Sequence, residues 1–484
     1  MPEADVVIIG GGIVGTAVAR AFSRYQLDIV LLEKEPDLPW GATRANSGIV
    51  HSGYHNTPGT AKARLCARGN LLLRRLAPAL QVPFRQNGSL TVAFTPEEAA
   101  KLDEWYAHGR ANGVSGLRLV SGRAAARLEP NLALGVLRAL HAPTAGVISP
   151  YELALALAET AAANGVEIRL SSPVEALRPA GERVEVATPA GCYCARLVVN
   201  AAGLGAEAVA RMVGDETVRL KPRRGEEYIL DKAYGGLVTR TIFPTALGYS
   251  KGILVIPTVE GNLMLGPTDA PGAGPEDLFT TAEGYAEIAA ATRRLVPSLP
   301  GPGAVIASFA GLRATSVTND FVLGSSPVCP RLLHAAGIDS PGLTAAPAIA
   351  EEMVAHARVA GLRLQKKRDW SKGRLAPVCF RELDDEARAK LAAADPAWRH
   401  VVCRCELVTE AQVVEAIRRG ARTLDGVKLR TRAGMGRCQG GFCTTKVLAI
   451  LSRELNLPYT ALTKRGPGSE IVVEDLAGRG GGGQ

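Results

Sequence analysis

The sequence is poor in aromatic residues and has no long apolar run, and each shortage excludes a class of protein. Phe, Trp and Tyr make up only 5% of the 484 residues, too few for a surface on which nucleic-acid bases stack. The net charge of +9 is not gathered into a basic patch with interleaved aromatics, so we expect no nucleic-acid partner. No apolar run reaches the roughly 18 residues of a membrane-spanning helix. The positive charge permits a weak attraction to anionic substrates or to acidic surfaces.

The start of the chain lacks the features of a secretory signal, because no basic segment, apolar segment or cleavage site precedes the first predicted strand. We therefore expect a cytoplasmic protein. Nine cysteines in that compartment predict metal or redox chemistry rather than a disulfide framework. The length of 484 residues, 47% of them hydrophobic, predicts two or three domains with proper cores.

The first part of the chain predicts a βαβ unit. Short β-branched runs without alternation predict buried parallel strands over 5–9 and 27–32. Between them, a face of small and apolar residues predicts a helix over 16–25. This order of elements is typical of Rossmann-like domains.

A glycine motif lies where the first strand passes into the helix. Gly10, Gly12 and Gly15 form G-x-G-x-x-G, which permits a tight turn, a close approach to a pyrophosphate and close packing of helix on strand. The N-terminus of the helix offers free N–H groups to the phosphates. Glu33 ends the second strand and would accept hydrogen bonds from ribose hydroxyls. The motif predicts a dinucleotide site and leaves NAD and FAD both open.

Four further segments, together with this motif, resemble those of the FAD-dependent oxidoreductases of the D-amino-acid-oxidase and glycerol-3-phosphate dehydrogenase superfamily. The segments are the small-residue loop 42–54, Asn200-Ala201-Ala202-Gly203, Gly311-Leu312-Arg313 and the turn 337–347. The chain most resembles the large subunits of bacterial anaerobic glycerol-3-phosphate dehydrogenases and, next, the L-2-hydroxyglutarate oxidases. The resemblance covers nearly the whole chain and implies that the dinucleotide is FAD.

The resemblance also implies how an extended FAD is held. The glycine motif would bind the pyrophosphate, Glu33 the adenosine ribose and the backbone of Val174 the adenine. The flavin would lie beside the loop 43–49 and the turn 338–344, where a helix N-terminus stabilises negative charge on the reduced flavin. The implied FAD-binding residues are Gly10, Gly12, Ile13, Gly15, Glu33, Thr43, Ser47, Gly48, Ile49, Val174, Gly203, Ile338, Gly342, Leu343 and Thr344.

Oxidation of an alcohol by a flavin requires a base for the hydroxyl proton and, for an anionic substrate, cations that hold it. His51, in the loop predicted beside the flavin, matches a histidine of related glycerol-phosphate oxidases and is the candidate base. Arg313 and Lys251 match the substrate-binding cations of the family. A bidentate arginine fits a phosphate or a carboxylate equally well. A structural hydrogen bond or ion pair remains the alternative for each of the three residues.

Four cysteines near the C-terminus form the set C-x-C and C-x4-C. Four thiolates suit zinc or an iron–sulfur cluster, and glycines around the second pair would bring backbone N–H groups toward the sulfur atoms. The set resembles the bacterioferritin-associated-ferredoxin domain, which implies a [2Fe–2S] cluster; zinc and no metal remain the alternatives. A second C-x-C at 192–194 has no partner pair and is interpreted as structural. The predicted ligands are Cys403, Cys405, Cys438 and Cys443.

We therefore predict an α/β protein with a Rossmann-like FAD-binding domain, an antiparallel-sheet substrate domain and a small C-terminal iron–sulfur domain. The predicted domains are 1–80, 146–215 and 306–362 for FAD, 81–145 and 216–305 for substrate, a linker over 363–400, the [2Fe–2S] domain over 401–465 and a flexible tail over 466–484.

The predicted activity is oxidation of sn-glycerol 3-phosphate to dihydroxyacetone phosphate by hydride transfer to the flavin. The tail domain implies that electrons pass through the cluster to a partner subunit or carrier, and such a partner leaves peripheral membrane association open. The alternatives are an L-2-hydroxyglutarate or other 2-hydroxy-acid dehydrogenase and an amino-acid or amine dehydrogenase. An alternative of another class is a non-catalytic electron-transfer subunit.

Overall fold

The computed structural model describes residues 2–248, 251–274, 276–374 and 376–473. They divide into a larger unit that ends at Arg374 and a smaller unit formed by the residues after it together with Glu35–Leu38. The predicted α/β fold class is confirmed. The predicted linker over 363–400 differs from this division, because Trp370 is held in the larger unit. Its ring lies under the Arg24 guanidinium at 4.8 Å, and its Nε1–H donates to Ser23 Oγ at 3.1 Å.

The first sheet of the larger unit is the predicted Rossmann-like core. Its central strand β1 runs parallel between β2 and β12, with β9 beyond β2 and β20 beyond β12. Every residue of β2 and β20 is buried, because helices cover the sheet and leave no polar face. The parallel strands are β1 (Glu3–Ile9), β2 (Ile29–Leu32), β9 (Glu167–Arg169), β12 (Gly191–Asn200) and β20 (Leu332–Ala336).

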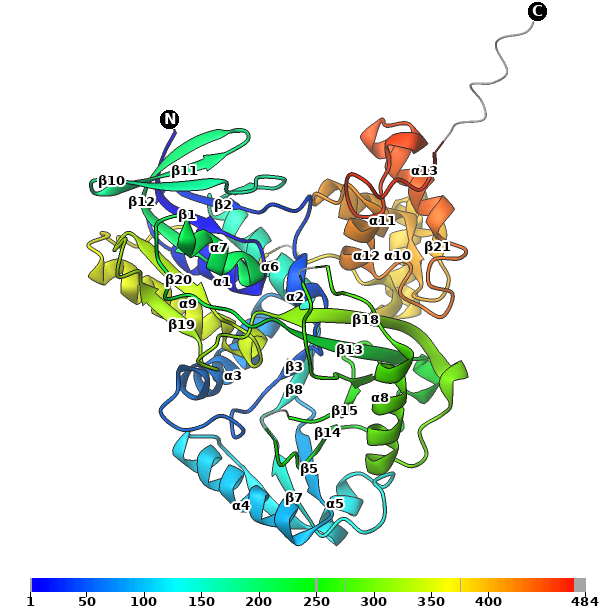
Figure 1. Cartoon of the computed structure of the whole chain (residues 1–484). Helices are drawn as coiled ribbons and strands as arrows, with labels where there is room; N and C mark the ends of the chain where they lie inside the picture. Colours follow the sequence, from blue (N-terminus) through cyan, green and yellow to red (C-terminus); the bar gives the residue numbers. More distant parts are fainter. Residues whose placement is uncertain (1, 249–250, 275, 375, 474–484) are drawn as a thin grey trace, which may run out of the picture. The chain divides into compact units, whose positions relative to one another are not determined.

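Helices and a hairpin complete this sheet. Helix α1 packs on α6 and α9, and β10, β11 and the first half of β12 form an antiparallel extension that Figure 1 shows at its edge. The elements are α1 (Ile13–Phe22), α3 (Ala61–Ala79), α6 (Pro150–Ala163), α7 (Ala206–Arg211), α9 (Gly342–Val359), β10 (Ala176–Ala180), β11 (Arg183–Thr188) and β19 (Val322–Ser325). Helix α9 begins at Gly342, so part of the predicted turn 337–347 is its first turn.

The second sheet of the larger unit corresponds to the predicted substrate domain. It is antiparallel apart from the pair β5 and β14, which is parallel. Helix α8 packs on its central strands and α4 on β5 and β7. Its elements are β5 (Ser89–Ala93), α4 (Pro96–Ala111), β6 (Arg118–Ser121), α5 (Gly122–Leu128), β7 (Arg138–Ala142), β13 (Arg223–Leu230), β14 (Thr241–Pro244), β15 (Leu254–Pro257), β16 (Leu263–Gly266), β17 (Ala270–Pro271), α8 (Ala282–Leu295) and β18 (Val305–Arg313).

Strand β18 corrects the predicted domain limits. The sequence analysis assigned residues from 306 onward to the FAD-binding domain, but β18 pairs along its length with β13. Figure 1 shows the two long strands side by side. This pairing brings Arg313 opposite Arg223 at one end of the second sheet.

A small third sheet links the two halves of the larger unit. Strand β3 pairs with β8, which also pairs with β4. The short helix α2 precedes β3 in the loop that the sequence analysis placed beside the flavin. The elements are α2 (Gly41–Arg44), β3 (Ile49–Val50), β4 (Phe84–Arg85) and β8 (Gly146–Ile148).

The smaller unit is mostly helical around its own apolar core. Its elements are α10 (Asp385–Ala394), β21 (Val401–Cys403), β22 (Val408–Thr409), α11 (Glu410–Arg418), α12 (Leu424–Thr431) and α13 (Thr444–Leu455). The predicted flexible tail from 466 begins too early, because the N–H of Lys464 donates to the carbonyl of Ser469 at 2.8 Å. The rest of that predicted tail, 474–484, lies outside the described residues. Across the described ranges, no helix combines the length and hydropathy of a membrane span.

Candidate functional site

The glycine motif is held together by contacts that only glycines allow. Gly10 has φ of +106°, a conformation that favours glycine. A Cβ on Gly15 would lie 1.8 Å from the carbonyl oxygen of Gly10, so α1 packs directly on the turn. Gly12 is the N-cap of α1 and has no side chain to cover the helix end. Gly10 and Gly12 are half-buried and carry no side chain at this end of the helix, which fits the approach of a pyrophosphate.

Two predicted side chains bind this glycine turn. The Gly11 N–H donates to Glu33 Oε2 at 2.6 Å, and the Ile13 N–H donates to Thr43 Oγ1 at 3.0 Å. Glu33 thus fixes the turn in addition to the predicted ribose contact. Thr43 connects the first turn of α1 to the loop that carries His51. These contacts bring Gly10, Gly12, Ile13, Gly15, Glu33 and Thr43 into one place.

Two other predicted contacts lie near the same strands. The Ser172 N–H donates to the Glu33 carbonyl at 2.8 Å, and Val174 packs on the core beneath β1 and β2. Gly203 begins a short 3₁₀ turn directly after β12. The carbonyl of Ala201 lies 2.4 Å from where a Cβ of Gly10 would stand, so this turn adjoins the glycine motif. Gly203 therefore lies close to the glycine motif, and Val174 lies two residues after the contact to Glu33.

Thr344 joins the two segments predicted to lie beside the flavin. Its Oγ1 accepts the His51 N–H at 2.9 Å and donates to the Ile49 carbonyl at 3.3 Å. Thr344 is in the first turn of α9, so the start of that helix is tied to the loop 43–51. Gly342 and Leu343 lie in the same first turn of α9 and Ile338 shortly before it, and the loop 43–51 also holds Ser47 and Gly48.

His51 and Lys251 are connected through a serine. Lys251 Nζ donates to Ser340 Oγ at 2.9 Å, and Ser340 Oγ lies 3.3 Å from His51 Nε2. The three residues come from the loop after β3, the segment before β15 and the turn before α9. Two of the predicted catalytic residues are thereby brought together. Tyr249 and Ser250, which precede Lys251, lie outside the described residues.

Burial and neighbouring cations keep the imidazole of His51 neutral, while Lys251 keeps its charge. Burial lowers the pKa of His51 well below its ordinary value, and the charge of Lys251 and then His55 lowers it further. A neutral imidazole at pH 7 has a free acceptor nitrogen, which a general base requires. Burial also lowers the pKa of Lys251 to about 8, so the ammonium form predominates at neutral pH.

Arg313 is the third of the predicted catalytic residues. Its guanidinium donates to Asp269 Oδ1 at 3.1 Å and to the Thr268 carbonyl at 3.0 Å, and Arg223 donates to the same Asp269 oxygen at 2.6 Å. The positive charge of Arg313 lowers the pKa of Lys251. The two predicted cations therefore act on a common region, although Arg313 is also part of an ion-pair network with Asp269.

Three residues of this region have no role predicted from the sequence. Ser340 lies in the predicted turn but was given no role. Half-buried His55 packs against Phe243, with ring centroids 5.2 Å apart. Glu227 is buried on β13, and burial raises its pKa to about 7. A glutamate in the middle of a buried strand was the signal that was available for the last residue.

The four predicted cysteine ligands lie in the smaller unit and approach in two pairs. The sulfur atoms of Cys405 and Cys438 are 3.6 Å apart. A hydrogen bond from Cys443 lowers the pKa of Cys403 to about 6. Backbone N–H groups of Gly434 and Gly440 point to the sulfur atoms of Cys403 and Cys438. In the described ranges, no single point gathers three or more side chains as a one-ion metal site would.

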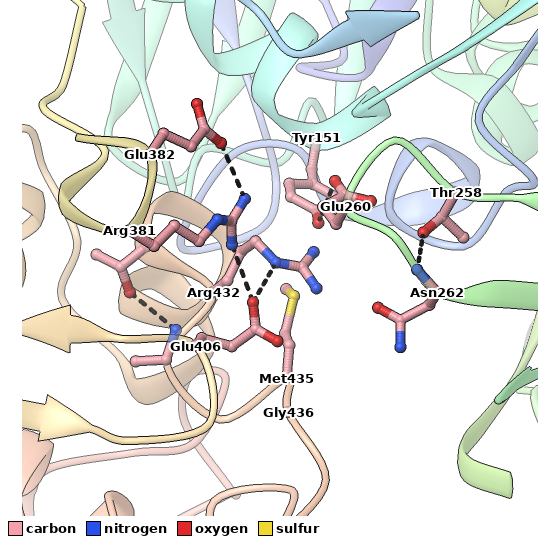
Figure 2. A network of polar contacts seen from close by, with 12 residues as sticks. Tyr151, Thr258, Glu260, Asn262, Arg381, Glu382, Glu406, Arg432, Met435 and Gly436 are labelled. Atoms are coloured by element: carbon pink, nitrogen blue, oxygen red, sulfur yellow. Dashed lines mark hydrogen bonds and ion pairs between the residues drawn. The ribbon is translucent and has the colours of Figure 1, made fainter. Parts of the chain in front are cut away.

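These contacts fit a cluster that is bound by two pairs of thiolates. Each iron of a [2Fe–2S] cluster takes two protein ligands, and N–H groups directed at the sulfur atoms tune such clusters. Figure 2 shows how the loop is held: the carboxylate of Glu406 lies between two guanidinium groups. Arg381 Nη1 and Arg432 Nε each donate to Glu406 Oε2 at 2.9 Å. This ion pair anchors the residue next to Cys405.

Comparison with known proteins agrees with both sites. Residues 5–356 match the family described as FAD dependent oxidoreductase, and residues 401–453 match the family described as BFD-like [2Fe-2S] binding domain. The chain is 41% identical over 471 residues to a glycerol 3-phosphate dehydrogenase of Caloramator mitchellensis, which covers 97% of this chain and 98% of that protein. It is 28% identical over 408 residues to a mitochondrial L-2-hydroxyglutarate dehydrogenase of Caenorhabditis elegans, covering 74% of this chain and 94% of that protein.

A solved structure resembles the larger part of the chain. It is the dithionite-reduced L-alpha-glycerophosphate oxidase of Mycoplasma pneumoniae with FAD bound. The TM-score is 0.73 at 28% identity, and the match covers 77% of this chain and 99% of that chain.

Proposed function

The chain belongs to the FAD dependent oxidoreductase family, and we propose that it oxidises sn-glycerol 3-phosphate to dihydroxyacetone phosphate. It is an FAD-dependent oxidoreductase, and its cofactors are FAD and a [2Fe–2S] cluster, as predicted. The choice of substrate is supported by the 41% identity to a protein named glycerol 3-phosphate dehydrogenase over nearly its whole length.

The observation that carries the proposal is the hydrogen-bonded series Lys251–Ser340–His51. It combines a base and a cation, the two groups that oxidation of a phosphorylated alcohol requires. The lysine lies 2.9 Å from the serine, and the serine 3.3 Å from the imidazole. A non-catalytic electron-transfer subunit would have no need for this arrangement.

In the proposed reaction, Lys251 and Arg313 bind the phosphate. The substrate hydroxyl that is oxidised takes the place of the Ser340 hydroxyl at neutral His51 Nε2, which accepts its proton. Thr344 holds the backbone of His51 in place by the 2.9 Å hydrogen bond. Before the substrate binds, Ser340 orients the imidazole and separates it from the lysine ammonium. FAD, when bound by the fifteen residues named from the resemblance, supplies the acceptor for the hydride that leaves the carbon.

The four cysteines provide the exit for the electrons in this proposal. They would hold the [2Fe–2S] cluster, from which a partner subunit or a soluble carrier takes the electrons. The support is the thiol pairing in the smaller unit together with the domain that residues 401–453 match.

The test is the visible spectrum of anaerobically purified holoprotein before and after addition of substrate. We expect glycerol 3-phosphate to bleach the flavin band, and L-2-hydroxyglutarate and amino acids to leave it unchanged. A flavin band that glycerol 3-phosphate does not change would disprove the proposed substrate. Bleaching by L-2-hydroxyglutarate alone would establish the 2-hydroxy-acid activity in its place.

A further inference from the structure

Glu227 lies on the face of β13 that turns toward His51. Side chains alternate along a strand, so Gly225, Glu227 and Ile229 share one face. Ile229 packs on an apolar cluster that contains Ile49 and Phe243, and the Phe243 ring lies 6.1 Å from the ring of His51. The Arg313 guanidinium lies directly over Gly225, since a Cβ there would stand 2.3 Å from its Nη2. Glu227 therefore belongs to the face that carries the proposed substrate groups.

One oxygen of this carboxyl group has a partner and the other does not. The Ser47 hydroxyl donates to Oε1, and Ser47 is in the loop predicted beside the flavin. The Oε2 atom is buried and has no hydrogen-bond partner among the described residues. The side chain is only 3% exposed, so bulk water does not replace the missing partner. Buried polar atoms in native proteins rarely lack a partner, so this oxygen requires one from outside the chain, such as a water, an ion or a ligand.

The neighbouring Glu226, on the opposite face of the strand, shows what a glutamate with a purely structural role looks like. Its Oε2 accepts the Thr281 N–H at 2.8 Å and its Oε1 accepts the Thr281 hydroxyl at 3.0 Å. Both of its oxygens are thus used within the fold. Arg313 is not the missing partner of Glu227 Oε2, because its guanidinium donates to Asp269 and to the Thr268 carbonyl.

We propose that Glu227 Oε2 accepts a hydrogen bond from the free hydroxyl of the substrate, on the carbon next to the one that is oxidised. This inference rests on the proposed function and extends it to specificity. Glycerol 3-phosphate carries a neutral CH₂OH group at that position, whereas a 2-hydroxy acid carries a carboxylate. A hydroxyl donates to the glutamate, but a carboxylate has no proton to donate and is repelled by it.

The carboxyl group therefore selects between the two substrate classes that the cations do not distinguish. Lys251 and Arg313 attract a phosphate or a carboxylate alike. A buried acceptor rejects a substrate that leaves it unpaired, and a like charge adds repulsion. Burial raises the pKa of Glu227 to about 7, so the substrates are compared at pH 8, where the charged carboxylate predominates.

The experiment measures kcat/KM for flavin reduction in the FAD-loaded full chain with three probes. The probes are glycerol 3-phosphate, propane-1,2-diol 1-phosphate, which lacks only the free hydroxyl, and L-2-hydroxyglutarate. We expect the wild-type protein to prefer glycerol 3-phosphate over the deoxy compound by about 100-fold or more. In Glu227→Ala this preference falls to within about tenfold, because the rate with glycerol 3-phosphate drops and the rate with the deoxy compound does not.

Two further variants keep the inference testable if Glu227→Ala does not fold. Glu227→Gln retains the shape and the contact to Ser47 but loses the charge, so the rate with L-2-hydroxyglutarate relative to glycerol 3-phosphate rises by about tenfold. Glu226→Gln is the matched control on the opposite face and leaves both ratios unchanged.

The outcomes separate the inference from the proposed function. A wild-type protein that glycerol 3-phosphate reduces, together with unchanged ratios in both Glu227 variants, overturns the inference alone. A wild-type protein that glycerol 3-phosphate does not reduce overturns the proposed function and the inference with it.

Discussion

In the larger unit, the nucleotide end, the turn Gly10–Gly15, is shaped by backbone contacts. The reactive end, formed by His51, Ser340 and Lys251, is held together by side chains. At the first, the Gly15 position touches the Gly10 carbonyl, and no Cβ fits between them. At the second, His51, Ser340 and Lys251 meet through hydrogen bonds of 2.9 and 3.3 Å between their side chains. A substitution at the first end therefore displaces the fold around the cofactor, while one at the second end changes rate and leaves the fold intact.

The largest effect is expected at the backbone-built end. In Gly15→Val, the new Cβ would stand 1.8 Å from the Gly10 carbonyl oxygen, so α1 and the turn cannot keep their present contact. We expect the variant to lose bound FAD, measured as the flavin absorbance that remains after gel filtration. Gly41→Ala is the control, because a Cβ there has nothing within 4 Å and FAD content should stay at the wild-type level.

Loss of the base is the next largest effect. In His51→Gln, the amide cannot accept the hydroxyl proton, so the rate of flavin reduction by glycerol 3-phosphate should fall by about 10²–10⁴-fold. The FAD content should not change, because the contact to Thr344 uses the backbone N–H of residue 51. Stopped-flow absorbance under anaerobic conditions measures the rate. An unchanged rate would show that His51 is not the base.

The same contrast explains which features could be predicted from the sequence. The glycine motif, β1 and α1 follow one another along the chain, and local pattern is enough to place them. Ser340 and Glu227 gain their roles from residues that are 289 and 180 positions away, and no local pattern records such contacts. The resemblance to a family supplied His51, Lys251 and Arg313 but not the groups that orient them.

The domain predicted for β18 was wrong for a related reason. Its sequence is compatible with either sheet, and only its pairing with β13 decides between them. The linker prediction failed because charged and proline-rich composition concealed the contacts of Trp370 with the arginines of α1 and the residues after it. Composition describes what a segment prefers on its own, and tertiary contacts overrode it in both places.

A smaller effect is expected in the pH dependence of flavin reduction. A base acts in its neutral form, so the acidic limb of kcat/KM that His51 sets lies at the pKa of His51, which burial and Lys251 hold well below 6.5. A change near pH 7 belongs instead to Glu227, whose pKa burial raises to about 7. In Lys251→Met, the repulsion between the two cations is removed, the pKa of His51 rises, and the acidic limb moves to higher pH. A limb that does not move would mean that Lys251 does not act on His51.

The smallest effect on flavin reduction is expected from the smaller unit. In Cys405→Ala one of the four thiols is lost, so the holoprotein should lose its cluster absorbance, iron and sulfide. The rate of flavin reduction by glycerol 3-phosphate should remain within about twofold of wild type, because none of the groups proposed to bind or deprotonate the substrate belongs to the smaller unit. Transfer of the electrons to an added one-electron carrier should fall sharply. If instead carrier reduction stays at the wild-type rate without a cluster, electrons leave the flavin directly, and the cysteine pairs serve the stability of the smaller unit rather than its redox chemistry.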